Sequence, residues 1–151
     1  PVEGDCTDGL DGDNDNDVDC DDSDCAAEAA CSSLADVDLG TYSAPISVSG
    51  DNYSANDTLT PSCGFAGGDV IYELTIAAAG DFDFNLSSSF PGVIAVLGAP
   101  AASPELGCRD AFNTAPTQMV LTLAAGTYYV VVEGYAPSHT GTYTLTVTEV
   151  N

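Results

Sequence analysis

The chain has 151 residues, of which 24 are acidic and one is basic, so its formal net charge is −23 at pH 7. This charge leaves no cationic patch for phosphate groups, which excludes nucleic acids and anionic membrane surfaces as partners. Divalent cations are the natural counter-charge. The length allows one domain of ordinary size and a small appendage.

The first segment, residues 1–33, is rich in aspartate and cysteine. Ten aspartates lie between Asp5 and Asp24, and the only basic residue, Arg109, is more than eighty positions away. Neighbouring carboxylates about 6–7 Å apart repel by roughly 0.6 kcal/mol per pair even in water. Such a segment is therefore either a solvated, disordered arm or the shell of a bound cation. The regular spacing of its aspartates favours the cation.

A calcium loop takes oxygen ligands at positions 1, 3, 5, 7, 9 and 12, with a residue that tolerates positive φ at position 6. A register that starts at residue 11 supplies Asp11, Asp13, Asp15, the carbonyl of Asp17, Asp19 and Asp22. Asn16 then falls at the turn, and asparagine tolerates positive φ. A register that starts at residue 13 puts the β-branched Val18 there, at a cost. We therefore predict Ca²⁺ in the first register.

Departures from the preferred calcium-loop residues indicate the affinity for Ca²⁺, and the flanking acids indicate how many ions can bind. Asn16 replaces the preferred Gly, and Asp22 replaces the bidentate Glu, which indicates affinity suited to extracellular calcium at about 10⁻⁴–10⁻³ M. Mg²⁺ fits less well, because it keeps more of its waters. The flanking acids offer ligands for a second ion: Glu3, Asp5, Asp8, Asp21 and Asp24.

Six cysteines occur, and C-x2-C spacing, typical of thiolate zinc sites, is absent. We therefore expect disulfides and an oxidising compartment. Four cysteines lie in the acidic segment and two in the remainder, so each part can close its own bridges. The expected pairs are Cys63–Cys108, Cys6–Cys20 and Cys25–Cys31, although the four in the arm allow three pairings.

From residue 34 to 151 the composition changes to Thr, Ser, Val, Ala and Gly, with alternating apolar residues between Gly- and Pro-rich turns. This pattern predicts eight short strands. Their ranges are 37–43, 45–50, 70–77, 81–87, 93–98, 118–125, 127–134 and 141–149. Strands with one apolar face must stack into two sheets, so we predict an all-β, antiparallel, jelly-roll-like β-sandwich.

Alternation also assigns faces. The side chains predicted to point into the core are Val70, Tyr72, Leu74, Ile76, Phe82, Phe84, Leu86, Met119, Leu121, Leu123, Tyr128, Val130, Val132, Tyr143, Leu145 and Val147. The last strand presents an outward row of Thr142, Thr144, Thr146 and Thr148. Such a threonine face favours extended backbone and tolerates solvent. It suits a solvent-exposed sheet surface, or one that packs against another sheet.

Two resemblances cover nearly the whole chain. "CTDGLDGDNDNDVDCDDSDC" resembles the Asp/Cys-rich calcium repeats of exported myxobacterial proteins, which are similar to thrombospondin type-3 and dockerin loops; Asn16 and Asp17 depart from that pattern. "SCGFAGGDVIYELTI", "ELGCRD" and "GTYYVVVEGYAPSHTGTYTLTVTEV" resemble bacterial pre-peptidase C-terminal domains. That family is a β-sandwich appended to secreted proteases and other exported proteins, which implies an extracellular or cell-surface bacterial protein.

The sequence gives little support for catalysis or for sugar binding. His139, the only histidine, lies in a Pro/Gly-bounded turn without a nucleophile elbow. Asp81 and Asp83 share the outward face of a strand, as solvated carboxylates do. Arg109 is expected to pair with Asp110 or another surface acid. The tyrosines left for stacking on a sugar are Tyr42, Tyr53, Tyr129 and Tyr135, which are scattered. We predict no catalytic residue and no organic cofactor.

The hypothesis that follows is a non-catalytic exported structural protein, stiffened by calcium and disulfides, that forms homo-oligomers or filaments through its acidic arm and sandwich faces. The alternative is an accessory carbohydrate- or protein-binding module of a secreted hydrolase. The chain does not begin with Met and shows no signal peptide, which we interpret as a trimmed export product. No run approaches 18 apolar residues, so no transmembrane helix is predicted.

Overall fold

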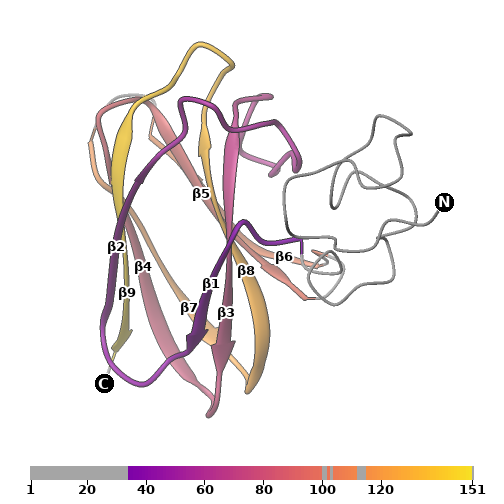
Figure 1. Cartoon of the computed structure of the whole chain (residues 1–151). Helices are drawn as coiled ribbons and strands as arrows, with labels where there is room; N and C mark the ends of the chain where they lie inside the picture. The colour runs from indigo at the N-terminus through magenta and orange to yellow at the C-terminus, as the bar shows by residue number, and fades with distance from the viewer. Residues whose placement is uncertain (1–33, 100–101, 103, 112–114, 151) are drawn as a thin grey trace, which may run out of the picture. The chain divides into compact units, whose positions relative to one another are not determined.

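The computed structural model describes residues 34–99, 102, 104–111 and 115–150. They form a sandwich of two β-sheets (Figure 1), which confirms the predicted fold class. In chain order the strands are β1 (Val37–Thr41), β2 (Ile46–Asp51), β3 (Asp69–Ile76), β4 (Gly80–Ser88), β5 (Gly92–Gly98), β6 (Glu105–Asp110), β7 (Thr117–Leu123), β8 (Gly126–Gly134) and β9 (Thr142–Val150). Within these ranges no helix is long or apolar enough to cross a membrane.

The two sheets have different sizes. One has five strands in the order β1-β3-β8-β5-β6, and the other has four in the order β2-β9-β4-β7. The pairing of β1 with β3 is parallel, whereas the other strand pairs are antiparallel. Because β1 and β2 are consecutive but lie in different sheets, the first connection crosses from one layer to the other.

The structure contains one strand more than the sequence analysis predicted. β6 lies between the predicted strands 93–98 and 118–125, in a stretch, "ELGCRD", that alternates poorly and contains a glycine. It pairs with β5, with a register irregularity between Val96 and Leu97. A Cβ at Gly107 would lie 3.0 Å from the side chains of Met119 and Leu121 in β7. Glycine therefore allows β6 to approach β7 and close this side of the sandwich.

The core between the sheets consists of the side chains that alternation predicted. Phe84, Leu145 and Val130 are fully buried, and the other inward residues are buried or pack against the cluster they form. Burial of a Leu, Val or Phe side chain contributes about 1.5–3 kcal/mol. This core is the main source of stability, and it positions the loops at both ends.

Two strands of the five-stranded sheet are buried on both faces. Every residue of β5 from Gly92 to Leu97 is buried, and so is β8 from Tyr129 to Gly134. The sequence analysis left Tyr129 available for a ligand, and this was wrong, because its side chain is 1% exposed. Strands buried on both sides carry continuous apolar runs, so the sequence pattern does not show which face of the sheet each side chain lies on.

Candidate functional site

The predicted calcium ligands lie outside the described residues. They are Asp11, Asp13, Asp15, Asp17, Asp19 and Asp22, with Asp8, Asp21 and Asp24 for a second ion. The arm cysteines Cys6, Cys20, Cys25 and Cys31 also lie there. The calcium site and the arm disulfides therefore stay predictions. In the described part of the chain, no group of three or more His, Cys, Asp or Glu side chains is placed to hold a metal ion.

The loop between β2 and β3, residues 52–68, is tied to β6. Cys63 and Cys108 form a disulfide with Cα atoms 5.8 Å apart, which is the pair expected from the sequence. Beside it, the Glu105 carboxylate accepts hydrogen bonds from the backbone N–H of Ser62, at 2.9 Å, and from its hydroxyl group. The loop is therefore anchored to the edge of the five-stranded sheet by one covalent and one polar tie.

His139 lies in the turn between β8 and β9. Its ring stacks on Tyr135, with centroids 6.3 Å apart, and its Nδ1 is buried without a hydrogen-bond partner. Its backbone carbonyl accepts a hydrogen bond from Asn52 Nδ2 at 3.1 Å. A catalytic base requires a hydroxyl or thiol nucleophile on one ring nitrogen and an orienting group on the other. The buried Nδ1 has neither.

The remaining charged candidates are surface groups. Asp81 accepts a hydrogen bond from Thr122 Oγ1 at 2.5 Å, and Asp83 accepts one from Gln118 Nε2 at 2.6 Å. Both carboxylates thus belong to the polar lattice of the four-stranded sheet. Arg109 and Asp110 are consecutive residues of β6, so their side chains leave opposite faces. No ion pair between them is present among the described residues, so the expected pairing with Asp110 is wrong.

The tyrosines do not form a stacking platform. Tyr42 packs edge-to-face on Phe82, with centroids 5.1 Å apart, and Tyr129 is buried. Tyr53, at 64% exposed, lies in the 52–68 loop. Inside the core, the hydroxyls of Tyr72 and Tyr143 are 2.6 Å apart and join the two sheets. Burial raises the pKa of both phenols, so they stay neutral.

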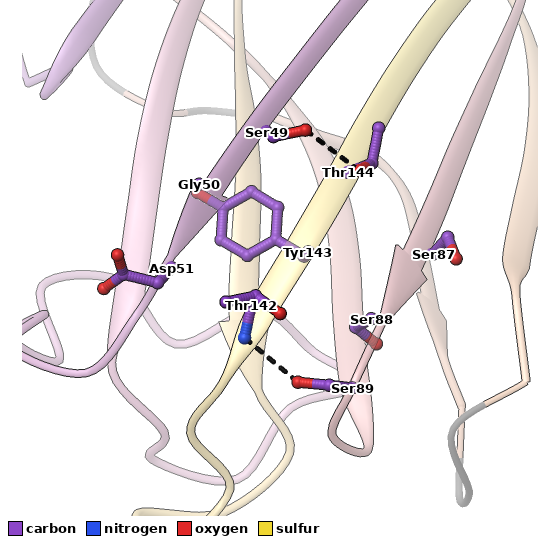
Figure 2. Close-up of a pocket in the computed structure, with 9 residues that line it drawn as sticks. All are labelled: Ser49, Gly50, Asp51, Ser87, Ser88, Ser89, Thr142, Tyr143 and Thr144. Carbon is purple, nitrogen blue, oxygen red and sulfur yellow. Dashed lines mark hydrogen bonds between the residues drawn. The ribbon is translucent and has the colours of Figure 1, made fainter.

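A polar groove lies at one end of the four-stranded sheet (Figure 2). Its volume is about 650 Å³, and its walls come from the ends of β2, β4 and β9 with the residues that follow β4. The lining residues are Ser49, Gly50, Asp51, Ser87, Ser88, Ser89, Thr142, Tyr143 and Thr144. Ser49 Oγ lies 3.1 Å from Thr144 Oγ1, and Ser89 Oγ accepts the Thr142 N–H at 3.0 Å. Hydroxyl groups that both donate and accept suit a polyhydroxylated ligand.

A smaller cleft of about 250 Å³ has acidic walls. Asp36, Asp51 and Asp69 line it, together with residues of the 52–68 loop. Two of these carboxylates are used locally: Asp36 accepts the Ile71 N–H at 2.8 Å, and Asp51 accepts the Tyr53 N–H at 3.2 Å. Burial raises the pKa of Asp69 against two backbone hydrogen bonds that lower it.

The sequence analysis missed two buried carboxylates. Asp69 begins β3 and is 3% exposed, and Glu133 lies near the end of β8 and is fully buried. The available signal was a lone acid inside an apolar run, as in "VVVEGY". A lone charge in such a run is unusual, because an ionised side chain is costly to bury without a partner.

No protein-family model and no curated protein sequence matches this chain. Solved structures do match it. The sandwich is similar in fold to a pre-peptidase C-terminal domain. That domain, from the collagenase of Bacillus anthracis, aligns with a TM-score of 0.55 at 14% identity, covering 76% of this chain and 96% of that one. The PliG protein of Aeromonas hydrophila, a periplasmic inhibitor of g-type lysozyme, aligns with a TM-score of 0.50 at 16% identity, covering 76% and 96%.

At these identities the similarity is one of fold. It supports the resemblance of the sandwich to pre-peptidase C-terminal domains at that level, and the resemblance of the arm lies outside the described residues. The Cys63–Cys108 disulfide is consistent with export.

Proposed function

We propose that this protein is a non-catalytic exported structural subunit that assembles with copies of itself, with calcium bound in its N-terminal arm. One observation carries the proposal: the outer face of the four-stranded sheet is an ordered array of short, mostly uncharged polar side chains. We call it the hydroxyl face. Its uncharged polar members are Ser47, Ser49, Asn85, Ser87, Gln118, Thr122, Thr142, Thr144, Thr146 and Thr148, and three aspartates lie on the same face, Asp51, Asp81 and Asp83.

The hydroxyl face is organised in rows across the strands. Ser49, Thr144 and Ser87 are register partners, and so are Ser47, Thr146 and Asn85. Hydroxyl and amide groups donate and accept hydrogen bonds, so a face made of them is complementary to a copy of itself. Short side chains also lose less rotamer entropy than Lys, Arg or Glu when they are immobilised.

Two exposed apolar side chains add to this surface. Val120 is 53% exposed and Val150 is 45% exposed, and they are the register partners of Asp83 and Asp81 on β4. Apolar side chains surrounded by polar ones are typical of surfaces that pack against a partner.

Charge explains why calcium matters to the proposal. The chain carries 24 acidic residues against Arg109 alone, so two copies repel each other at low ionic strength. Divalent ions bound to the aspartates of the arm lower that charge. Assembly is therefore expected to require calcium.

The test is electron microscopy and sedimentation of the whole protein in millimolar Ca²⁺ and in EGTA. We expect ordered assemblies in Ca²⁺ only, and their loss in Thr146→Arg, which puts a long cation at the centre of the hydroxyl face. Ser138→Arg, an exposed change in the β8–β9 turn, is the matched control and should assemble normally. A monomer in Ca²⁺, or assemblies that persist in EGTA, would overturn the proposal.

A second candidate function is an accessory binding module of a secreted hydrolase. The groove between β2, β4 and β9 favours it, since its hydroxyl lining suits a glycan. Similarity of fold to a domain of a collagenase also supports it. Retention on insoluble polysaccharides would identify this function, provided that Ser87→Arg, which fills the groove, abolishes retention and Ser138→Arg does not.

A further inference from the structure

Asp69 and Glu133 form a buried pair of carboxyl groups on the outer face of the five-stranded sheet. They are register partners in β3 and β8, so their side chains leave the same face side by side. Asp69 is 3% exposed and Glu133 is 0% exposed. Ionised carboxylates are rarely buried to this extent unless a cation or a hydrogen-bond donor satisfies them.

Both side chains hold the 52–68 loop against the sheet. Asp69 Oδ2 accepts the backbone N–H groups of Thr58 and Leu59, at 3.0 and 2.7 Å. Glu133 Oε1 accepts the N–H of Gly67 at 3.0 Å. At Gly64 a Cβ would lie 2.3 Å from Glu133 Oε2, so only glycine allows the loop backbone to rest on this carboxyl group. The loop therefore lies directly over the pair.

Each carboxyl group has one oxygen left over. Asp69 Oδ1 and Glu133 Oε2 are both buried and have no hydrogen-bond partner. In the described part of the chain, the titratable groups on the surrounding elements include Asp36 before β1, Asp57 in the loop, Asp110 in β6, Tyr129 in β8 and His139 in the β8–β9 turn. Arg109, the only basic residue of the chain, leaves the face of β6 opposite to Asp110.

A single proton between the two carboxyl groups can satisfy both unpartnered oxygens. With one proton on the pair, the two carboxyl groups together carry one charge instead of two, and a protonated carboxyl oxygen can donate a hydrogen bond to a neighbouring carboxylate. We propose that Asp69 and Glu133 share one proton, and that this proton latches the 52–68 loop onto the five-stranded sheet. The close approach of Gly64 leaves little room for a hydrated cation, which favours the proton.

The electrostatics agree with this geometry. Burial raises the pKa of Glu133 to about 7, and the negative charges of Asp69 and Asp57 add to the increase. The latch therefore opens near neutral pH: loss of the proton leaves two adjacent carboxylates that repel each other. The loop carries the two most exposed aromatic side chains of the described residues, Tyr53 at 64% and Phe65 at 68%. Latching thus holds the loop that carries these two aromatics.

The sign of the pH dependence follows from the shift. An ordinary glutamate, as in the unfolded chain, has a pKa near 4.5, whereas that of folded Glu133 is about 7. The folded protein holds the extra proton between these values, so the contribution of Glu133 to stability is fully present below pH 4.5 and is lost as pH rises through 7. We expect the folding equilibrium constant to fall roughly ten- to three-hundredfold across this window.

The experiment follows unfolding by urea from pH 5 to 9, with the whole protein at fixed salt and Ca²⁺. Hydrogen-exchange protection of the Thr58, Leu59 and Gly67 amides is measured in parallel. Glu133→Gln imitates the protonated acid and keeps a donor toward Asp69, so its stability and loop protection should not change through pH 7. Glu149→Gln, which removes an exposed carboxylate from β9, should keep the wild-type pH dependence.

Two results would overturn the proposal. One is a Glu133→Gln variant with the same pH dependence as the wild type. The other is a Ca²⁺-induced stabilisation at pH 8 that Glu133→Gln removes, since a cation would then occupy the pair. Should the variant not fold, infrared spectroscopy of the wild type still decides. The carbonyl band of a protonated carboxyl group must be present at pH 6 and lost above pH 8, and its absence at pH 6 refutes the latch.

Discussion

The two sheets differ in what lies on their outer faces. The four-stranded sheet has its apolar side chains inside and the hydroxyl face outside. The five-stranded sheet is buried on both sides in β5 and β8, where Val93, Ala95 and Val131 are fully buried on the outer face. The two outer faces therefore differ in burial, and their tolerance to substitution should be opposite.

The sharpest test puts the same residue on both outer faces. Val131→Lys places a charge at a fully buried position of β8 and should cost about 4–5 kcal/mol of unfolding free energy, or prevent folding. Thr146→Lys, on β9, should change stability by no more than about 0.5 kcal/mol. Urea unfolding of both variants measures the difference. Equal effects would contradict the assignment of the two faces.

The second test removes the covalent tie of the five-stranded sheet. The disulfide joins Cys63 and Cys108, which are 45 positions apart, and a closed loop of this length stabilises by about 4 kcal/mol in the chain-entropy model. The double variant Cys63→Ala/Cys108→Ala should lose most of this, measured by calorimetry without reductant. A loss below about 1 kcal/mol would mean that the polar tie through Glu105 suffices.

The third test acts on the contact that joins the sheets. Tyr143→Phe leaves the buried hydroxyl of Tyr72 without its partner and should cost about 1–2 kcal/mol. The double variant with Tyr72→Phe removes both hydroxyls and should cost less than the sum of the two single changes. A double-mutant cycle measures this coupling, and strict additivity would contradict the bond.

The smallest effect belongs to the hydroxyl face. Ser49→Ala removes one cross-strand hydroxyl contact, with Thr144, which should cost only about 0.2–1 kcal/mol because both groups are exposed. Thermal unfolding of the monomer in EGTA gives the value. A larger loss would show that the face stabilises the single chain as well as a contact between copies.

The difference between the sheets also explains which features of the fold could be predicted from the sequence. In β4 and β9 the polar and apolar residues alternate, so the inward side chains Phe82, Phe84, Tyr143 and Leu145 were assigned correctly. In β8 the run "YVVVEG" has no alternation, and Tyr129 was predicted to be accessible to a ligand although it is buried. β6 was missed, because a strand held by a disulfide and a glycine contact needs no periodic pattern.

The buried acids mark a second limit. Nothing local in the sequence tells that Asp69 and Glu133, which are 64 positions apart, become register partners. Their pairing depends on the β3–β8 register, and their burial depends on how the 52–68 loop folds back. Both are tertiary effects, so a propensity or a spacing argument cannot supply them.

The directions of the first and last strands, β1 and β9, have a mechanical consequence. β1 belongs to the five-stranded sheet and β9 to the four-stranded one, and both run toward the same end of the sandwich (Figure 1). Tension applied between Val37, the first residue of β1, and Val150, the last residue of β9, therefore acts along the strands. Hydrogen bonds loaded lengthwise share the force and break together, whereas a hairpin pulled from one end unzips bond by bond. We expect the sandwich to resist a stretching force applied at these two positions.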